Sequence, residues 1–357
     1  MLIKFFHLFN LIIFILYVNE IQCLLNKQKK IINLAFPVNS KYINFLYIAL
    51  VTLFENSNKN TIYKIFIQIG KDFNKKYLKI IIQLEKIYFN CFIHIIDMKY
   101  DFYGTIEGKL DISTYYRLKL PILCPKLNRI IHIDSDTLIL KDLMELYTLN
   151  FQGKYLLGRL DILADELDSL GIKTNTYINC GVLLIDLYNL RKYNYTDKFM
   201  EYIKYHNNYK YLNHHDQTLL NYVCHDKIGY FRPKYHMWPF RNKKEIINTN
   251  KAFRTPYNQA EFLADFYDPF IIHFPGEYKK NIKEKGGIYH EKYYKYSLLA
   301  EERKKNKKKN GFFKFNDYII HLIKKVKYRY KKKKYAKVIF LSLIYIIVIF
   351  AILNTFY

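Results

Sequence analysis

Short apolar runs alternate with amphipathic stretches along most of the chain, from Ile31 to about Phe274. The runs IINLAF, IYKIFIQI and CFIHIID have the length and the β-branched composition of buried strands. After the first run, with Ser40 as the expected helix cap, apolar residues recur on one helical face: Phe45, Leu46, Ala49, Leu50 and Leu53. A second helical stretch around Leu78 to Leu84 separates the next two runs. This alternation predicts βα units on a mainly parallel sheet, an α/β fold.

A fourth predicted strand, Ile130–Ile133, ends in Asp134, Ser135 and Asp136. Side chains alternate along a strand, so both carboxylates point to one side, and open α/β sheets bind ligands beyond the carboxyl ends of their strands. Neighbouring carboxylates repel each other unless a cation or a shared proton intervenes, so the pair favours a divalent metal, Mg²⁺ or Mn²⁺. Solvated acids at a strand end are one alternative. A haloacid-dehalogenase-type phosphatase is another, although Leu138 stands where its motif has Thr or Val.

The composition indicates a folded protein with a basic tail. Apolar residues make up 51% of the 357, which excludes wholesale disorder. The net charge is +26, but the segment Lys279–Lys337 holds 22 Lys/Arg against 5 Asp/Glu and therefore supplies +17 of it. The five cysteines include no CxxC pair, so neither a disulfide framework nor a zinc ribbon is indicated, and a reducing compartment is favoured.

Hydrophobic segments stand at both ends of the sequence. Residues 1–23 have a basic start and an apolar stretch but no small-residue cleavage site, which fits an uncleaved helix or a signal peptide. Near the other end, Val338–Leu353 is 16 residues without a charge, directly after the basic run YRYKKKKYAK. We therefore expect a catalytic domain at 31–287, a helical lysine-rich stalk at 288–337 and a transmembrane anchor at 338–357.

Four further motifs follow one another in a fixed order: YYRLKLP, YINCGVLLIDL, HHDQTLLNYV and IIHFPGEYKKN. Together with the acid pair they resemble the family 8 retaining glycosyltransferases, which include lipopolysaccharide galactosyl- and glucosyltransferases and glycogenin. The resemblance runs from about Ile32 to Asn281, roughly 70% of the chain. It implies a GT-A fold, a Rossmann-like domain with a mainly parallel central sheet flanked by helices.

The resemblance implies a metal site built from distant residues. Asp134, Asp136 and His273 fall on the positions that bind Mn²⁺, which in turn holds the diphosphate of a UDP-sugar. Two carboxylates and an imidazole suit Mn²⁺ better than Mg²⁺, the alternative ion, because the nitrogen ligand favours the later metal. His273, Gly276 and Lys279 meet the family pattern HxxGxxK, in which glycine lets the backbone approach phosphate and lysine adds charge. Lys280-Asn281 replaces the usual Pro-Trp after it.

The remaining expected UDP-sugar contacts also come from the resemblance. They are Asn39, Arg117, Ser135, Asp161, Asn179, Asp216 and Gln217, in addition to the residues of the metal and phosphate site. Asn39 stands where the family often has an aspartate that holds uracil and ribose. Structural alternatives are a surface charge for Arg117, a turn for Asn179 and a helix cap for Asp216. Asp216 and Gln217 are the expected catalytic residues, acting beside the anomeric carbon.

The expected activity is therefore Mn²⁺-dependent, retaining transfer of a hexose, galactose or glucose, from UDP to a glycan or glycolipid. Synthesis of lipopolysaccharide or another cell-surface polysaccharide is the expected setting. In a bacterium the domain would work at the cytoplasmic face of the membrane, and in a eukaryote in the Golgi lumen. Two alternatives remain: a basic protein that binds nucleic acid or a membrane surface, and a catalytically inactive UDP-sugar binder. We expect no specific nucleic-acid partner.

Overall fold

The computed structural model describes residues 30–102, 111–161, 167–168, 171–172, 176–205, 215–240, 244–245, 248, 257–276, 278–279 and 289–305. One compact unit contains the described residues up to Glu85 and from Asn90 to Lys305. Lys86–Phe89, the end of helix α4 (Leu84–Ile87) and the turn after it, fall outside this unit. The hydrophobic segments predicted at 1–23 and 338–357 lie outside the described residues, whose helices include none with the length and apolar content to cross a membrane.

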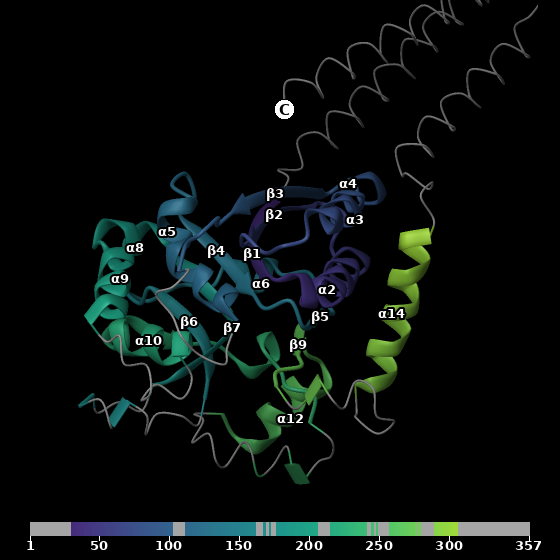
Figure 1. The fold of residues 1–357 in the computed structure, drawn as a ribbon. Helices are drawn as coiled ribbons and strands as arrows, with labels where there is room; N and C mark the ends of the chain where they lie inside the picture. Colours follow the sequence, from purple (N-terminus) through teal and green to yellow (C-terminus); the bar gives the residue numbers. More distant parts are fainter. Residues whose placement is uncertain are drawn as a thin grey trace, which may run out of the picture. The chain divides into compact units, whose positions relative to one another are not determined.

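The centre of the first unit is a seven-stranded sheet in the order β3-β2-β1-β4-β7-β6-β8 (Figure 1). Strands β1, β2, β3 and β4 pair in parallel and match the four predicted strands, whereas β7 pairs antiparallel with β4 and with β6. The predicted α/β fold with a mainly parallel sheet is confirmed. The strands are β1 (Lys30–Val38), β2 (Thr61–Ile69), β3 (Cys91–Asp97), β4 (Arg129–Ile133), β6 (Leu156–Leu160), β7 (Ile178–Asp186) and β8 (Ile228–Tyr230).

Helices cover both faces of the sheet. Helix α2 packs under β1 and β2 with α3, whereas α5, α8, α9 and α10 pack with a 3-10 helix, η3, on the opposite face (Figure 1). A buried hydrophobic core fills this second interface and includes Ile130, Ile185, Phe199 and Leu219. The bounds are α2 (Ile43–Glu55), α3 (Leu78–Ile82), η3 (Ile112–Lys119), α5 (Leu120–Leu123), α6 (Met144–Tyr147), α8 (Leu187–Lys192), α9 (Tyr195–Tyr205), α10 (His215–Val223) and α12 (Gln259–Tyr267).

A small second sheet connects two segments that are far apart in the sequence. Strand β5 (Thr137–Ile139) follows the acid pair and runs antiparallel to β9 (Ile271–His273). Their register places Thr137 opposite His273. This pairing carries the predicted histidine ligand to the carboxyl end of β4.

Two local expectations need correction. Asn39, not Ser40, caps the turn before α2, because its side-chain oxygen accepts hydrogen bonds from the N–H groups of Lys41 (2.8 Å) and Tyr42 (3.1 Å). The helical stretch expected around Leu78 to Leu84 is broken at Gln83 into α3 and α4. The predicted apolar face of α2 is buried except at Phe45, which is half-buried, and β5 and α14 cover further sides of this helix.

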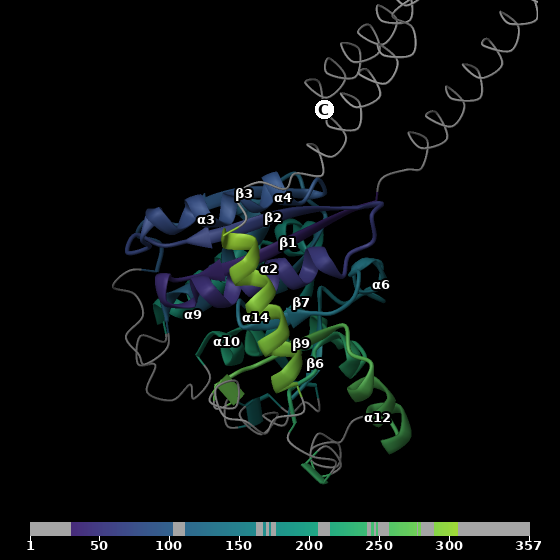
Figure 2. The same cartoon turned by 90° about the vertical axis from the view of Figure 1, so that its right-hand side faces the viewer.

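The segment expected to begin a solvated stalk at residue 288 forms helix α14 (His290–Lys305), which lies beside α2 (Figure 2). Asn56 at the end of α2 donates a hydrogen bond to the hydroxyl of Tyr296 (2.9 Å), and Arg303 forms an ion pair with Glu55 (2.8 Å). The Tyr293 ring packs edge-on against Phe274, next to the predicted ligand His273. The folded domain therefore extends to Lys305 instead of ending at residue 287.

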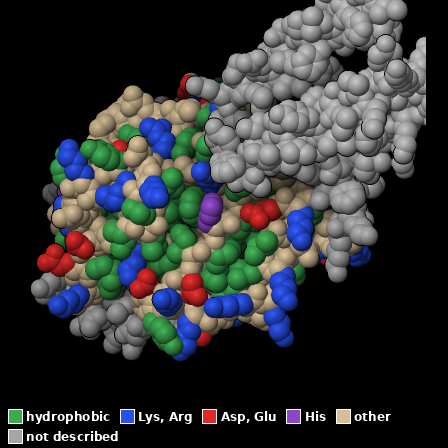
Figure 3. Space-filling model, turned by 90° about the horizontal axis from the view of Figure 1, so that it is seen from above, with side chains coloured by type: hydrophobic (Ala, Val, Ile, Leu, Met, Phe, Trp, Pro, Cys, Tyr) green, Lys and Arg blue, Asp and Glu red, His purple; other side chains and the backbone are tan. Residues whose placement is uncertain are grey.

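Among the described residues, large apolar side chains are exposed at the β3 edge of the sheet and at the start of β1. Phe92 is 44% exposed, and Ile31 at the start of β1 is 45% exposed. His94 of β3 stacks on Phe66 of β2 with ring centroids 5.0 Å apart. Figure 3, seen from the side of β3, shows hydrophobic side chains gathered around a histidine and bordered by charged groups.

Candidate functional site

The loop between β4 and β5 is held by hydrogen bonds along its whole length. The Asp134 N–H donates to the Gly181 carbonyl of β7 (2.8 Å), and the Phe274 N–H donates to the Asp136 carbonyl (3.0 Å). Ser135 was predicted to contact the UDP-sugar. It is buried, and its hydroxyl donates a hydrogen bond to the Pro37 carbonyl (2.9 Å). Ser135 thus fixes the loop to the end of β1, and these hydrogen bonds together fix the positions of Asp134 and Asp136.

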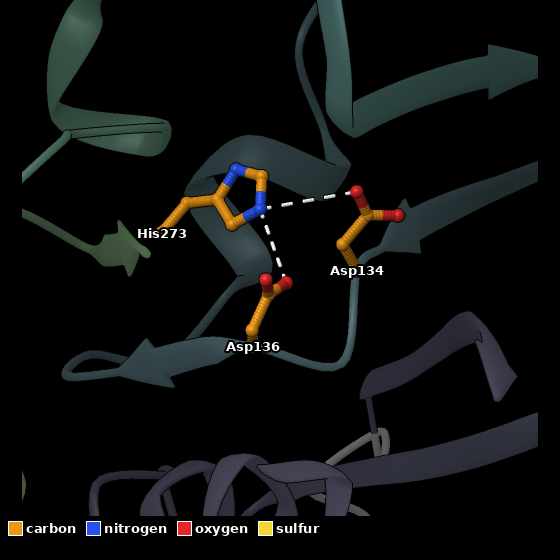
Figure 4. A group of neighbouring side chains, drawn as sticks. All are labelled: Asp134, Asp136 and His273. Atoms are coloured by element: carbon orange, nitrogen blue, oxygen red, sulfur yellow. Dashed lines mark hydrogen bonds and ion pairs between the residues drawn. The ribbon is translucent and has the colours of Figure 1, made fainter. Parts of the chain in front are cut away.

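Asp134, Asp136 and His273 come together as the sequence predicted (Figure 4). Nε2 of His273 lies 3.1 Å from Oδ1 of Asp136 and 3.8 Å from Oδ2 of Asp134, and one ligand atom from each residue lies within 4.8 Å of the others. Two hard carboxylate oxygens and one imidazole nitrogen form a donor set that fits a divalent transition metal. The three residues could therefore hold a divalent metal ion.

Asp134 is oriented by a buried arginine and a buried histidine. Its Oδ1 accepts hydrogen bonds from Nη2 of Arg117 (3.1 Å) and Nε2 of His132 (3.2 Å), while Oδ2 faces His273. Burial lowers the pKa of His132 to about 4, so its imidazole is neutral and donates through Nε2–H. Burial alone would raise the pKa of Asp134, but Arg117 and His132 outweigh it and hold the pKa far below its usual range. The other oxygen of Asp134, Oδ2, thus remains directed toward His273.

Asp136 is paired with the lysine of the HxxGxxK pattern. Nζ of Lys279 lies 2.8 Å from Oδ2 of Asp136 and donates to the hydroxyl of Tyr42 at 2.6 Å. Burial would raise the pKa of Asp136, but His273 and Lys279 lower it below its usual value, so Asp136 is ionised. Gly276 has φ of +49°, a left-handed conformation that glycine adopts without strain. The Lys280-Asn281 departure lies outside the described residues.

Arg117 joins the metal site to the expected catalytic carboxylate. Its Nε lies 3.4 Å from Oδ2 of Asp216, Nη1 donates to the Cys180 carbonyl, and the side chain is 4% exposed. The alternative of a surface charge is therefore wrong. Burial raises the pKa of Asp216 to about 6, against the opposing effect of Arg117. Asp134 and Asp216 thus share one buried cation.

The NCG and HDQ motifs meet beside this cluster. Nδ2 of Asn179 donates to Oδ2 of Asp161 (2.9 Å), which brings these two predicted sugar contacts together. The Cys180 N–H donates to Oε1 of Gln217 (3.0 Å). A Cβ on Gly181 would collide with the ring of His273, so glycine is required here for β7 to pass the metal site.

Asn39 is engaged at both ends of its amide. Its oxygen caps the turn before α2, and its Nδ2 donates to Oδ2 of Asp111 (2.5 Å). A contact with the base of a nucleotide stays a prediction for this residue.

Sequence reasoning missed two buried histidines at the site. His132 stands two residues before Asp134 on the same side of β4, so strand alternation could have identified it. His236 donates or accepts a hydrogen bond at Nδ1 of His273 (2.8 Å), but it belongs to no quoted motif and no spacing rule connects it with the site.

Comparisons with known proteins agree with this geometry. A family model described as Glycosyl transferase family 8 matches residues 33–280. General stress protein A of Bacillus subtilis (strain 168) is 24% identical over 284 residues, which cover 76% of this chain and 94% of that protein. Lipopolysaccharide 1,2-glucosyltransferase of Escherichia coli is 25% identical over 261 residues, with 70% of this chain and 73% of that protein covered.

A comparison with solved structures agrees with the fold expected from the sequence. The galactosyltransferase LgtC, solved in complex with donor and acceptor sugar analogs, matches with a TM-score of 0.60 at 18% identity and covers 75% of this chain and 96% of its own. This likeness confirms the GT-A fold. Because the family model spans well over half of the sequence, this protein belongs to glycosyl transferase family 8 and is a hexosyltransferase.

Proposed function

We propose that this enzyme transfers a hexose, galactose or glucose, from a UDP-sugar to a glycan or glycolipid in a Mn²⁺-dependent reaction that retains the anomeric configuration. The observation that carries the proposal is the cluster of Asp134, Asp136 and His273, whose ligand atoms lie within 4.8 Å of one another at the carboxyl end of the sheet. Ligands of open α/β sheets bind at this edge. The E. coli relative, a lipopolysaccharide 1,2-glucosyltransferase, supports a cell-surface polysaccharide as the product.

The charges around the cluster suit a leaving diphosphate. When bound, a divalent metal would neutralise the negative charge that develops on the departing nucleotide. Lys279 places its ammonium group 2.8 Å from Asp136 and adds a second positive charge beside the metal ligands. Gly276, at φ +49°, lets the backbone before Lys279 adopt a left-handed turn without strain. Preorganised charges of this kind stabilise developing charge without reorganisation.

For retention we propose a front-face route in which the departing diphosphate helps to deprotonate the acceptor. Gln217 is an amide and a poor nucleophile, and its oxygen is already bound to the Cys180 N–H. Asp216 is buried against Arg117, with a pKa raised to about 6, which makes it a weak candidate for a free nucleophile. Both side chains would instead support positive charge at the anomeric centre. Gln217→Ala should keep a large share of activity, and a sugar adduct trapped on Asp216 would overturn this route.

A donor screen tests the proposed activity. Release of UDP from UDP-galactose, UDP-glucose and other UDP-sugars is measured with Mn²⁺, with Mg²⁺ and with EDTA. We expect one hexose donor to be turned over with Mn²⁺, more slowly with Mg²⁺, and not with EDTA. Binding of UDP-sugar without any turnover, even with a panel of acceptors, would contradict the proposal and favour an inactive sugar binder.

We also propose that the enzyme works at a membrane, on the cytoplasmic face in a bacterium or in the Golgi lumen in a eukaryote. The lysine-rich sequence after Lys305 and the uncharged segment 338–353 support this proposal. Fractionation of cells that express the full chain or a chain ending at Lys305 is the test. Equal recovery of both chains in the soluble fraction would contradict a C-terminal anchor.

A further inference from the structure

His236 lies directly behind the candidate ligand His273. Its Nε2 is 2.8 Å from Nδ1 of His273, on the side of that ring away from the two carboxylates. The ring centroids are 5.0 Å apart, and the two side chains are 0% and 3% exposed. Solvent therefore does not compete for Nδ1 of His273.

The backbone around His236 fixes this contact. The His236 N–H donates to the Pro233 carbonyl (2.9 Å), which closes the 3-10 helix η6 (Pro233–Tyr235). The next residue, Met237, is bound to β9 at both backbone groups: its N–H donates to Ile271 (2.8 Å), and its carbonyl accepts from His273 (2.8 Å). Because Met237, the residue after His236, is bonded to β9 through its main chain and the two rings are bonded directly, the imidazole pair has one defined geometry.

The chemistry of metal ligation decides the direction of the hydrogen bond. Nε2 of His273 faces Asp134 and Asp136, so this nitrogen must offer a lone pair to the metal, and the ring hydrogen must then reside on Nδ1. The nitrogen facing Nδ1 is Nε2 of His236, which must accept that hydrogen. His236 then carries its own hydrogen on Nδ1.

We propose that His236 is a positioning residue for the metal site: it accepts a hydrogen bond from Nδ1 of His273 and so holds the Nε2 lone pair toward the carboxylates. This inference rests on the proposed metal-dependent function. Partners of this kind fix the tautomer and orientation of a metal-binding imidazole, and their loss lowers metal affinity about 10–100-fold.

The test is Mn²⁺ binding to the purified full-length chain, followed by electron paramagnetic resonance of free Mn²⁺ without any sugar nucleotide. His236→Phe keeps a flat ring but has no acceptor, and we expect its dissociation constant to rise about 10–100-fold. His236→Gln, whose amide oxygen replaces Nε2, should stay within about threefold of the wild type. His94→Phe, on the exposed face of β3, is the matched control and should bind normally.

The outcomes separate the two proposals. If the wild type binds Mn²⁺ and His273→Ala does not, but His236→Phe binds as tightly as the wild type, the role of His236 is refuted and the metal site stands. If neither the wild type nor His273→Ala binds Mn²⁺, the proposed metal-dependent function itself fails.

A measurement on the unmodified protein covers the case in which His236→Phe does not fold. Long-range ¹H–¹⁵N spectra of the histidine-labelled chain loaded with Zn²⁺, a diamagnetic probe, report which ring nitrogens carry hydrogen. We expect hydrogen on Nδ1 of both His236 and His273. Hydrogen on Nε2 of His236 would overturn the inference.

Discussion

Arg117 offers a demanding test of the site's electrostatics, because its buried guanidinium lies between the half-buried carboxylate of Asp134 and the buried carboxylate of Asp216. It contacts Asp134 at 3.1 Å and Asp216 at 3.4 Å, and only 4% of the residue is exposed. Arg117→Met removes the charge while keeping an unbranched side chain. Removing one partner of a buried ion pair costs about 3–5 kcal/mol because the other charge is left uncompensated. At about 2–4 °C per kcal/mol for a domain of this size, Tm should fall by about 6–20 °C.

The assay is thermal unfolding of the full-length chain in detergent, at neutral pH and without added metal. Arg117→Lys is the first control: it keeps the charge, but a single ammonium group cannot bridge both carboxylates, so we expect a smaller fall. The double variant Arg117→Met/Asp216→Asn is the second, and it should recover part of the loss because one uncompensated charge is gone. A Tm for Arg117→Met within about 2 °C of the wild type would refute the reasoning.

Three further predictions follow from the same structure. A chain ending at Lys305 should keep the Tm and the activity of the full chain. A chain ending at residue 287 should have a lower Tm, because α14 no longer covers α2. Thermal unfolding and UDP-release assays of both chains check this. Gly181→Ala should weaken Mn²⁺ binding at least about tenfold, since the added methyl collides with His273, as paramagnetic resonance would reveal. Burial raises the pKa of Asp216 from 3.8 in the unfolded chain to about 6 in the folded one. The folded state therefore binds this proton more tightly, and the contribution of Asp216 to stability falls as pH rises from about 4 to about 6. Asp216→Asn should abolish that fall in a Tm-against-pH profile.

The sequence predicted the strands and the grouping of Asp134, Asp136 and His273 well, and the reasons are physical. Strands β1 to β4 are short apolar runs between polar loops, so their period and length identify them. The acid pair indicates a metal site only together with His273. The pairing of β5 with β9 is the long-range contact that brings the three residues together. The order of the motifs, not their local pattern, indicated that contact.

Other features depended on packing that local sequence does not encode. Helix α14 is rich in lysine and tyrosine, and its composition resembles a solvated stalk, yet Tyr293 and Tyr296 are used to pack against Phe274 and Asn56. For Arg117, local sequence left a surface charge open as the alternative to a sugar contact, but the side chain is buried and bonded to the Cys180 carbonyl and to two acids from other elements. Such contacts are set by tertiary structure.

We have proposed that Asp134, Asp136 and His273 form the metal site of a UDP-dependent hexosyltransferase. The most direct measurement is UDP release from the best hexose donor, titrated with Mn²⁺, for the wild type and for Asp136→Asn. Asp268→Asn, an exposed acid paired with Lys141, is the matched control. We expect Mn²⁺-dependent release by the wild type and by Asp268→Asn, and none above background by Asp136→Asn. Full release by Asp136→Asn, or release by the wild type that EDTA does not reduce, would contradict it.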